Sequence, residues 1–171
     1  MNIYFSDCKN DEYKQFVNTA LLTASKVLKI EDVKLCVNFA FVNKKEIKTL
    51  NKNFRSVDKV TDVLSFPALS PVKNNIITKD LNEKNYPHDI NPDTHEIILG
   101  DIYLCIDVAK KQAKEYGTGI MREIMYLSVH GLLHLLCYDH MIETDKMVMR
   151  EMEEKIMSEV KEYGVLFGFC I

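Results

Sequence analysis

The segment 128–140, which reads SVHGLLHLLCYDH, constrains this chain more than any other stretch. It holds three of the five histidines in the protein, at positions 130, 134 and 140. His130 and His134 are four residues apart, so on a helix they lie one above the other on the same face. The residues between Leu136 and His140 do not extend the apolar pattern, so the chain can turn there and return His140 toward the pair.

Three histidines in this arrangement predict a metal site. A single histidine on an apolar face is usually a core residue, but every buried imidazole needs a hydrogen-bond partner or a metal, and three together are hard to satisfy otherwise. Neutral imidazole binds zinc at about 2.0–2.1 Å, and three protein ligands leave a fourth position for water or substrate. We therefore predict one Zn²⁺ per chain, bound by His130, His134 and His140 on a central buried helix.

The same H-x3-H-x5-H spacing occurs in metzincin proteases, which this segment resembles in geometry. In the protease motif a glutamate directly follows the first histidine and acts as the general base. Here Gly131 occupies that position, and Cys137 stands at the bend where the protease motif has glycine. A zinc hydrolase that acts on peptides is therefore the weaker interpretation.

Length and composition indicate one globular domain that spans residues 1–171. Of the 171 residues, 47% are hydrophobic and 27% are charged, which is typical of a globular protein with a sizeable core. No apolar run is long enough for a membrane span, no basic region precedes an apolar stretch at the N-terminus, and the five scattered cysteines form no CxxC pair. These features predict a cytoplasmic protein. The formal net charge of −3 argues against nonspecific coating of nucleic acid but allows a local basic groove.

The hydrophobic periodicity predicts an α+β fold, with a small mixed β-sheet of about four strands packed with about five helices. The expected strands are Asn2–Ser6, Val33–Val42, Thr61–Phe66 and Ile97–Cys105. The expected helices run from about 13 to 29, 44 to 53, 107 to 116, 120 to 136 and 143 to 163. Asn43 and Thr118 are expected to cap helices at their N-termini, and Gly117 at a C-terminus. The segment 71–96 contains three of the four prolines and no sustained period, so we interpret it as a loop insertion.

The second expected helix has two distinct faces. Its apolar stripe consists of Ile47, Leu50 and Phe54. On another side lie three lysines spaced four residues apart, Lys44, Lys48 and Lys52, and Arg55 projects close to them. A row of cations suits the polyanionic backbone of a nucleic acid, although most such faces are only solvated. Both interpretations of the lysine face stay open at this point.

Three segments of the chain together resemble the YbeY family of endoribonucleases, which act in ribosomal RNA maturation. They appear in the family order and cover most of the chain between residues 50 and 140. They are LNKNFRSVDKVTDVLSFP at 50–67, LGDI at 99–102 followed by Gln112, Ala113 and Glu115, and Arg122–Glu123 followed by VHGLLHLLCYDH.

The resemblance implies a fold, an activity and a set of site residues. The zinc histidines of the family fall on His130, His134 and His140, and its functional arginine falls on Arg55. The resemblance also implies a cytoplasmic protein that works with the small ribosomal subunit. The chain departs from the family pattern at Cys137, where the family usually has glycine, at Val60, where it often has proline or alanine, and in the length of segment 71–96.

Our hypothesis is a zinc-dependent, single-strand-specific endoribonuclease that acts in ribosomal RNA processing and small-subunit quality control. Arg55 would bind the reacting phosphate with its planar guanidinium, His130 would hold the catalytic metal, and Lys44, Lys48 and Lys52 would guide the RNA strand. The sequence offers no obvious general base beyond water activated by the metal. Two alternatives stay open: a ribosome-assembly binding factor with a structural zinc, and a zinc hydrolase with another substrate.

Overall fold

A four-stranded mixed sheet forms one layer of the protein. The computed structural model describes residues 1–6, 10–71 and 76–166, with side chains described up to residue 160. The strands are β1 (Asn2–Ser6), β2 (Leu35–Val42), β3 (Val63–Pro67) and β4 (Ile97–Cys105), in the spatial order β1-β2-β4-β3. β1, β2 and β4 are parallel, whereas β3 pairs antiparallel with β4, so β1 and β3 form the edges.

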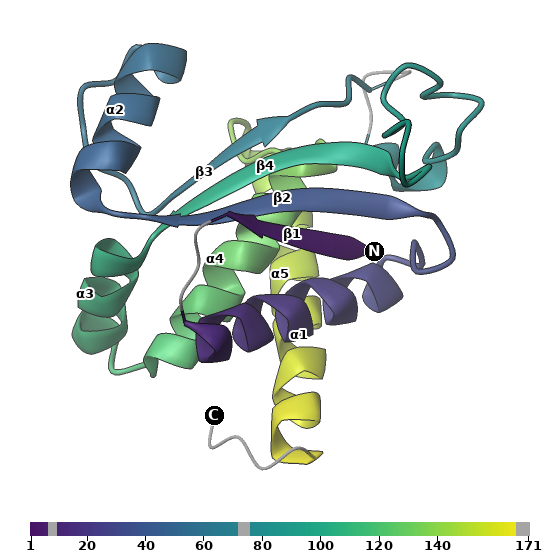
Figure 1. Cartoon of the computed structure of the whole chain (residues 1–171). Coiled ribbons are helices and arrows are strands. Elements are labelled where there is room, and N and C mark those ends of the chain that lie inside the picture. The colour runs from purple at the N-terminus through teal and green to yellow at the C-terminus, as the bar shows by residue number, and fades with distance from the viewer. Residues whose placement is uncertain (7–9, 72–75, 167–171) are drawn as a thin grey trace.

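The helices divide unequally between the two faces of the sheet (Figure 1). α1 (Asp11–Val27), α4 (Ile120–Leu135) and α5 (Glu143–Leu166) pack together below it, and α3 (Ile106–Tyr116) packs beside α4. α2 (Lys44–Arg55) lies alone on the other face, over β3 and β4. The predicted α+β architecture of four strands and five helices is confirmed. Within the described ranges, no helix is both long and apolar enough to cross a membrane.

The start of α2 confirms the predicted cap at Asn43, whereas the helix ends later than predicted. The side chain of Asn43 accepts hydrogen bonds from the backbone N–H groups of Lys45 (2.9 Å) and Glu46 (3.0 Å), and Glu46 accepts one from the Asn43 N–H (2.8 Å). This capping box satisfies N–H groups that the first turn otherwise leaves unpaired. Arg55 is the last residue of the helix, two residues beyond the predicted end at 53. Ser56 is the C-cap and adopts the left-handed conformation.

α4 is the central buried helix that the sequence predicts. Most of its side chains are inaccessible, and α1, α3, α5 and the sheet surround it. Its N-cap is Gly119, so the prediction that Thr118 caps this helix is wrong. The Thr118 hydroxyl instead donates to the buried carboxylate of Glu123 at 3.4 Å, so it is already engaged by the first turn of the helix.

The described residues of segment 71–96, which are 71 and 76–96, pack against the core more closely than a plain loop would. Among its described residues the regular structure is the short 3₁₀ helix η1 (Ile77–Lys79) and an isolated bridge from Ile90 to Ile97. Ile77, Leu81 and Tyr86 are buried in the main core. The Ile77 N–H also donates to the Leu136 carbonyl at 3.2 Å, which attaches this segment to the end of α4.

Candidate metal centre

The end of α4 brings all three predicted histidines together. His130 and His134 lie in its last turns, and His140 follows in the turn after the helix. One nitrogen from each ring lies within 4.8 Å of the others. His130 and His134 are partly buried, whereas His140 is exposed, so the cluster opens to solvent on the side of His140.

A Schellman motif makes the turn that returns His140. The N–H of Tyr138 donates to the Leu133 carbonyl at 3.0 Å, and the N–H of Cys137 donates to the His134 carbonyl at 3.1 Å. This pair of bonds requires a left-handed residue after the helix, usually glycine, and Cys137 takes that conformation with φ of 65°. Cys137 therefore adopts the left-handed conformation at the position where the YbeY-like pattern usually has glycine, and the cluster that could hold a metal does not include its thiol.

Hydrogen-bond partners fix which nitrogens of His130 and His134 carry hydrogen. Nδ1 of His134 lies 3.0 Å from the Tyr138 carbonyl oxygen, which can only accept, so this Nδ1 must donate. Nδ1 of His130 lies 2.6 Å from Oε1 of Glu153, and an ionised carboxylate likewise only accepts. The Nε2 atom of neutral His134 is then left with a lone pair, and Nε2 of His130 carries one in the neutral form that a metal ligand requires.

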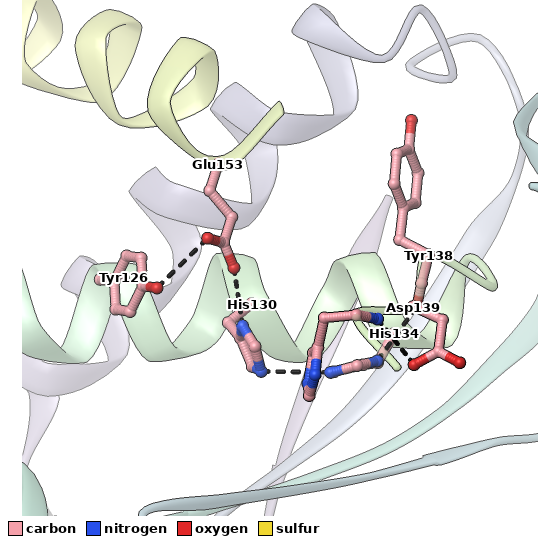
Figure 2. Close-up of polar contacts among 7 residues, drawn as sticks. Tyr126, His130, His134, Tyr138, Asp139 and Glu153 are labelled. Carbon is pink, nitrogen blue, oxygen red and sulfur yellow. Dashed lines mark hydrogen bonds and ion pairs between the residues drawn. The ribbon is translucent and has the colours of Figure 1, made fainter. Parts of the chain in front are cut away.

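These two Nε2 atoms face each other at 3.1 Å (Figure 2). When both rings are in this ligating form, a cation between or beside the two nitrogens removes the repulsion of their lone pairs. Burial, followed by the nearby His130 and His140, lowers the pKa of His134 to about 4, so this ring is neutral at pH 7. With His140 as the third nitrogen, the cluster can hold a metal ion, and an all-imidazole donor set suits zinc.

Glu153 is a site residue that the sequence did not reveal. It lies on α5 behind His130, is 7% exposed, and its second oxygen accepts a hydrogen bond from the Tyr126 hydroxyl at 3.2 Å (Figure 2). Burial, and then the Glu153 charge, raises the pKa of Tyr126 to about 12, so the phenol keeps the proton that it donates. A carboxylate behind a metal-binding histidine orients the ring and raises its basicity. The available signal was a glutamate four residues after buried Met149, on the inner face of the helix.

Gly131 shows why the protease glutamate is missing. A Cβ atom at this position would lie 3.1 Å from Oγ of Ser65 and 3.1 Å from Cγ2 of Ile102. Both neighbours are buried, so neither has room to move. The residue after His130 points at the sheet and α4 lies directly against it, so a glutamate does not fit at this position.

Arg55 reaches the same part of the sheet from the opposite face. Its Nη2 donates to the backbone carbonyl of Ser65 at 2.8 Å, and the Ser65 side chain faces Gly131, next to His130. Arg55 is thus connected to the histidine helix through one residue of the edge strand β3. Within the described part of the chain no carboxylate pairs with this guanidinium, so its charge is not neutralised.

The predicted lysine face is exposed but partly neutralised. Lys48 and Lys52 each lie 3.4 Å from a carboxylate oxygen of Asp58, and their contacts, led by that of Lys48, lower the pKa of this carboxyl. Lys44 is exposed in the first turn of α2. The lysines therefore lie on α2, on the other face of the sheet from the histidines, and their role in RNA binding stays a prediction.

Phe54 departs from the predicted apolar stripe of α2. Ile47 is fully buried and Leu50 is half-buried, but Phe54 is 69% exposed. The residues that follow it, up to Val60, are all exposed, so this ring is in contact with Phe66 on one side and is otherwise open.

Comparison with known proteins assigns this chain to a family. The family model described as Endoribonuclease YbeY matches residues 3–161. The chain belongs to the YbeY family. Endoribonuclease YbeY of Clostridium acetobutylicum is 43% identical over 143 residues, which cover 82% of this chain and 86% of that protein. Endoribonuclease YbeY of Staphylococcus carnosus is 42% identical over 157 residues, 91% of this chain and 90% of the relative.

A solved structure agrees with the fold. The solution structure of TM1509 from Thermotoga maritima matches with a TM-score of 0.58 and 28% identity, over 93% of this chain and 89% of that one. The resemblance inferred from the sequence is therefore confirmed. Membership of the YbeY family identifies the chain as a nuclease-type hydrolase.

Proposed function

We propose that this protein is a zinc-dependent endoribonuclease that cleaves single-stranded RNA and acts in the maturation and quality control of ribosomal RNA. The observation that carries the proposal is the convergence of the three histidines, with Nε2 of His130 and Nε2 of His134 3.1 Å apart beside exposed His140. An open three-histidine cluster is the donor set of a catalytic zinc rather than of a structural one, which normally has four protein ligands.

In this proposal the three histidines are the metal ligands, and two neighbouring groups orient them. His130, His134 and His140 would hold the zinc, and the carbonyl of Tyr138 and the carboxylate of Glu153 keep two of the rings in the ligating tautomer. Bound zinc supplies charge stabilisation on phosphoryl oxygens and a lowered pKa for water. A cavity of about 840 Å³ between α4 and α5 borders His130 and His140, and its basic side chains are Arg122, Lys146 and Arg150.

Arg55 supplies the phosphate contact. One of its terminal nitrogens is anchored to the Ser65 carbonyl, which leaves the remaining N–H groups of the planar fork for two phosphate oxygens. Because the guanidinium is already oriented, little side-chain freedom is lost when a strand binds. Lys44, Lys48 and Lys52 extend the positive surface along α2 from Arg55 and would guide the RNA backbone.

Glu153 is excluded as the general base by its position. It contacts the Nδ1 edge of His130, away from the edge that faces the other histidines, and both of its oxygens accept hydrogen bonds inside the protein. Its role is to position the ring. Peptide hydrolysis is not supported, because Gly131 leaves no space for the glutamate that a peptidase requires.

The proposed partners follow from the family resemblance. They are ribosomal RNA and the small ribosomal subunit with its associated proteins, in the cytoplasm. The alternative of a ribosome-assembly factor with a structural zinc predicts binding without cleavage. The exposed third ligand favours the enzyme, because structural zinc sites are closed.

The decisive experiment incubates purified, metal-quantified protein with a single-stranded RNA and with the same strand in a duplex. The single strand should be cut and the duplex spared, and the His130→Ala protein, prepared in parallel, should cut neither. Equal cleavage by wild type and His130→Ala would identify a contaminating nuclease. Tight RNA binding without cleavage by zinc-loaded wild type would support the assembly factor instead.

A further inference from the structure

The exposed ring of Phe54 is a feature that the proposed metal chemistry does not use. Phe54 lies in the last turn of α2, between Lys52 and Arg55, and is 69% exposed. Every residue from Lys52 to Val60 is exposed, so no part of the chain folds over this ring from its own segment. A large aromatic side chain held in water costs free energy unless a partner covers it.

The ring is held in place from one side. Its centroid lies 5.2 Å from that of Phe66 at an interplanar angle of 63°, and Phe66 in turn makes a 73° contact with Tyr103 at 5.8 Å. Such edge-to-face pairs add about 0.5–1.5 kcal/mol beyond area burial, so the aromatic row limits the freedom of Phe54 without covering it. The guanidinium of Arg55 lies 5.9 Å from the Phe66 ring centroid, so cation and aromatic row form one surface.

The charge around Phe54 indicates the chemistry of its partner. Residues 44–59 contain six basic and two acidic side chains, a local net charge of +4 in a chain whose formal net charge is −3. The rest of the chain is therefore acidic, and this segment is the electrostatic complement of a polyanion. An exposed aromatic ring within a basic surface is the arrangement with which proteins bind single-stranded nucleic acid.

We propose that Phe54 stacks against an unpaired base of the RNA whose phosphate Arg55 binds. This inference rests on the proposed function and names a specificity determinant for it. A base in a duplex is already stacked and paired, whereas a single-stranded base can offer a face to an aromatic side chain. Phe54 therefore contributes to the preference for single strands, and it accepts any base because every base has a π-face.

The absence of tryptophan from the chain gives a direct test. Phe54→Trp places a single tryptophan at the proposed stacking position, and its fluorescence should be quenched, saturably, by a single-stranded oligouridylate. The His130→Ala background keeps the bound strand uncut. Leu22→Trp is the matched control, because Leu22 is 41% exposed on α1, on the other face of the sheet. Its fluorescence should not respond to the same RNA.

Affinity measurements separate stacking from mere apolar contact. Phe54→Leu keeps an apolar side chain but has no π-face, so it should bind the oligouridylate about tenfold more weakly, whereas Phe54→Trp should bind at least as tightly as Phe54. Unchanged affinity in Phe54→Leu, or an unquenched tryptophan in a protein that still binds RNA, would overturn the stacking role while leaving the proposed function intact. Failure of the wild type to bind any single-stranded RNA would overturn both.

Discussion

The C-terminal ends of α4 and α2 both have a role in the proposed reaction, yet they are built in opposite ways. Around the end of α4, Nδ1 of His130, Nδ1 of His134 and the turn carbonyls have partners, and the backbone of Ile77 is bonded to Leu136. Around the end of α2, by contrast, residues 52–60 are all exposed. The two helices lie on opposite faces of the sheet, and the edge strand β3 connects them through Ser65.

The difference reflects what each end must recognise. A metal site requires its ligands within about 0.5 Å and 10–20° of the productive geometry, so every ring has to be oriented by a neighbour. A flexible RNA strand is attracted by charge and stacking, which tolerate variable geometry. Substitution of a histidine at the end of α4 should therefore abolish metal binding, whereas most substitutions at the end of α2 should weaken RNA binding by degrees.

The largest effect is expected from His134→Ala. Wild-type protein purified without added metal should contain about one zinc per chain, as expected for a three-histidine site. The variant loses a partly buried ring and one of the two facing Nε2 atoms, so stoichiometric zinc should disappear, together with RNA cleavage. Elemental analysis measures this directly, and full retention of zinc by the variant would remove His134 from the site.

Arg55 should behave unlike its exposed neighbours, because it is anchored to the sheet. Removing a preorganised donor from a developing charge typically costs about 10²–10³-fold in rate, so Arg55→Ala should cut RNA cleavage by that factor. Zinc content should not change, and the melting temperature should fall only slightly, since one hydrogen bond to a carbonyl contributes about 0.5–1.5 kcal/mol. Arg55→Lys should recover little, because an ammonium cannot reproduce the planar fork.

Cleavage of RNA by Arg55→Ala at the wild-type rate would contradict a catalytic role for Arg55. The whole end of α2 would then be a binding surface without a catalytic part. Lys48→Ala is the matched control for charge alone: it should weaken binding modestly and reduce the salt dependence by about one phosphate contact, with the maximal cleavage rate unchanged.

Glu153→Gln tests whether the orientation of His130 matters to the metal. The amide keeps the size of the side chain but lacks the charge that strengthens the imidazole as a ligand, and loss of such a partner typically lowers metal affinity 10–100-fold. Competition with a chelator measures the affinity without reference to cleavage. Glu154→Gln is the control, because Glu154 is the next residue and only pairs with Arg150 at 3.3 Å on the surface. Equal zinc affinities in the two variants would remove Glu153 from the site.

Glu153 also marks the limit of what the sequence could predict. The histidine spacing, the caps of α2 and α3 and the bounds of β1 and β4 depend on neighbours within a few residues, and these predictions are confirmed. The partner of His130 is 23 residues away on another helix, so only the packing of α4 against α5 reveals it. The prediction that Phe54 belongs to the apolar stripe of α2 is limited for a similar reason. Helical spacing predicts on which face of the helix a residue lies. It does not predict how far along that face a neighbouring element covers the side chains.

The smallest expected effect is that of Cys137→Gly, at the turn that holds His140. A non-glycine residue in the left-handed region costs about 1 kcal/mol, and glycine removes this cost. Loss of the half-buried side chain and the greater freedom of the unfolded chain act in the opposite direction. The free energy of unfolding should therefore change by no more than about 1 kcal/mol.

The same substitution should leave zinc affinity unchanged. Burial raises the pKa of the Cys137 thiol, which keeps it protonated and a poor ligand. Chemical denaturation and chelator competition on the same two proteins measure both quantities. A marked drop in zinc affinity would show that the thiol binds the metal and that this end of α4 provides four ligands rather than three.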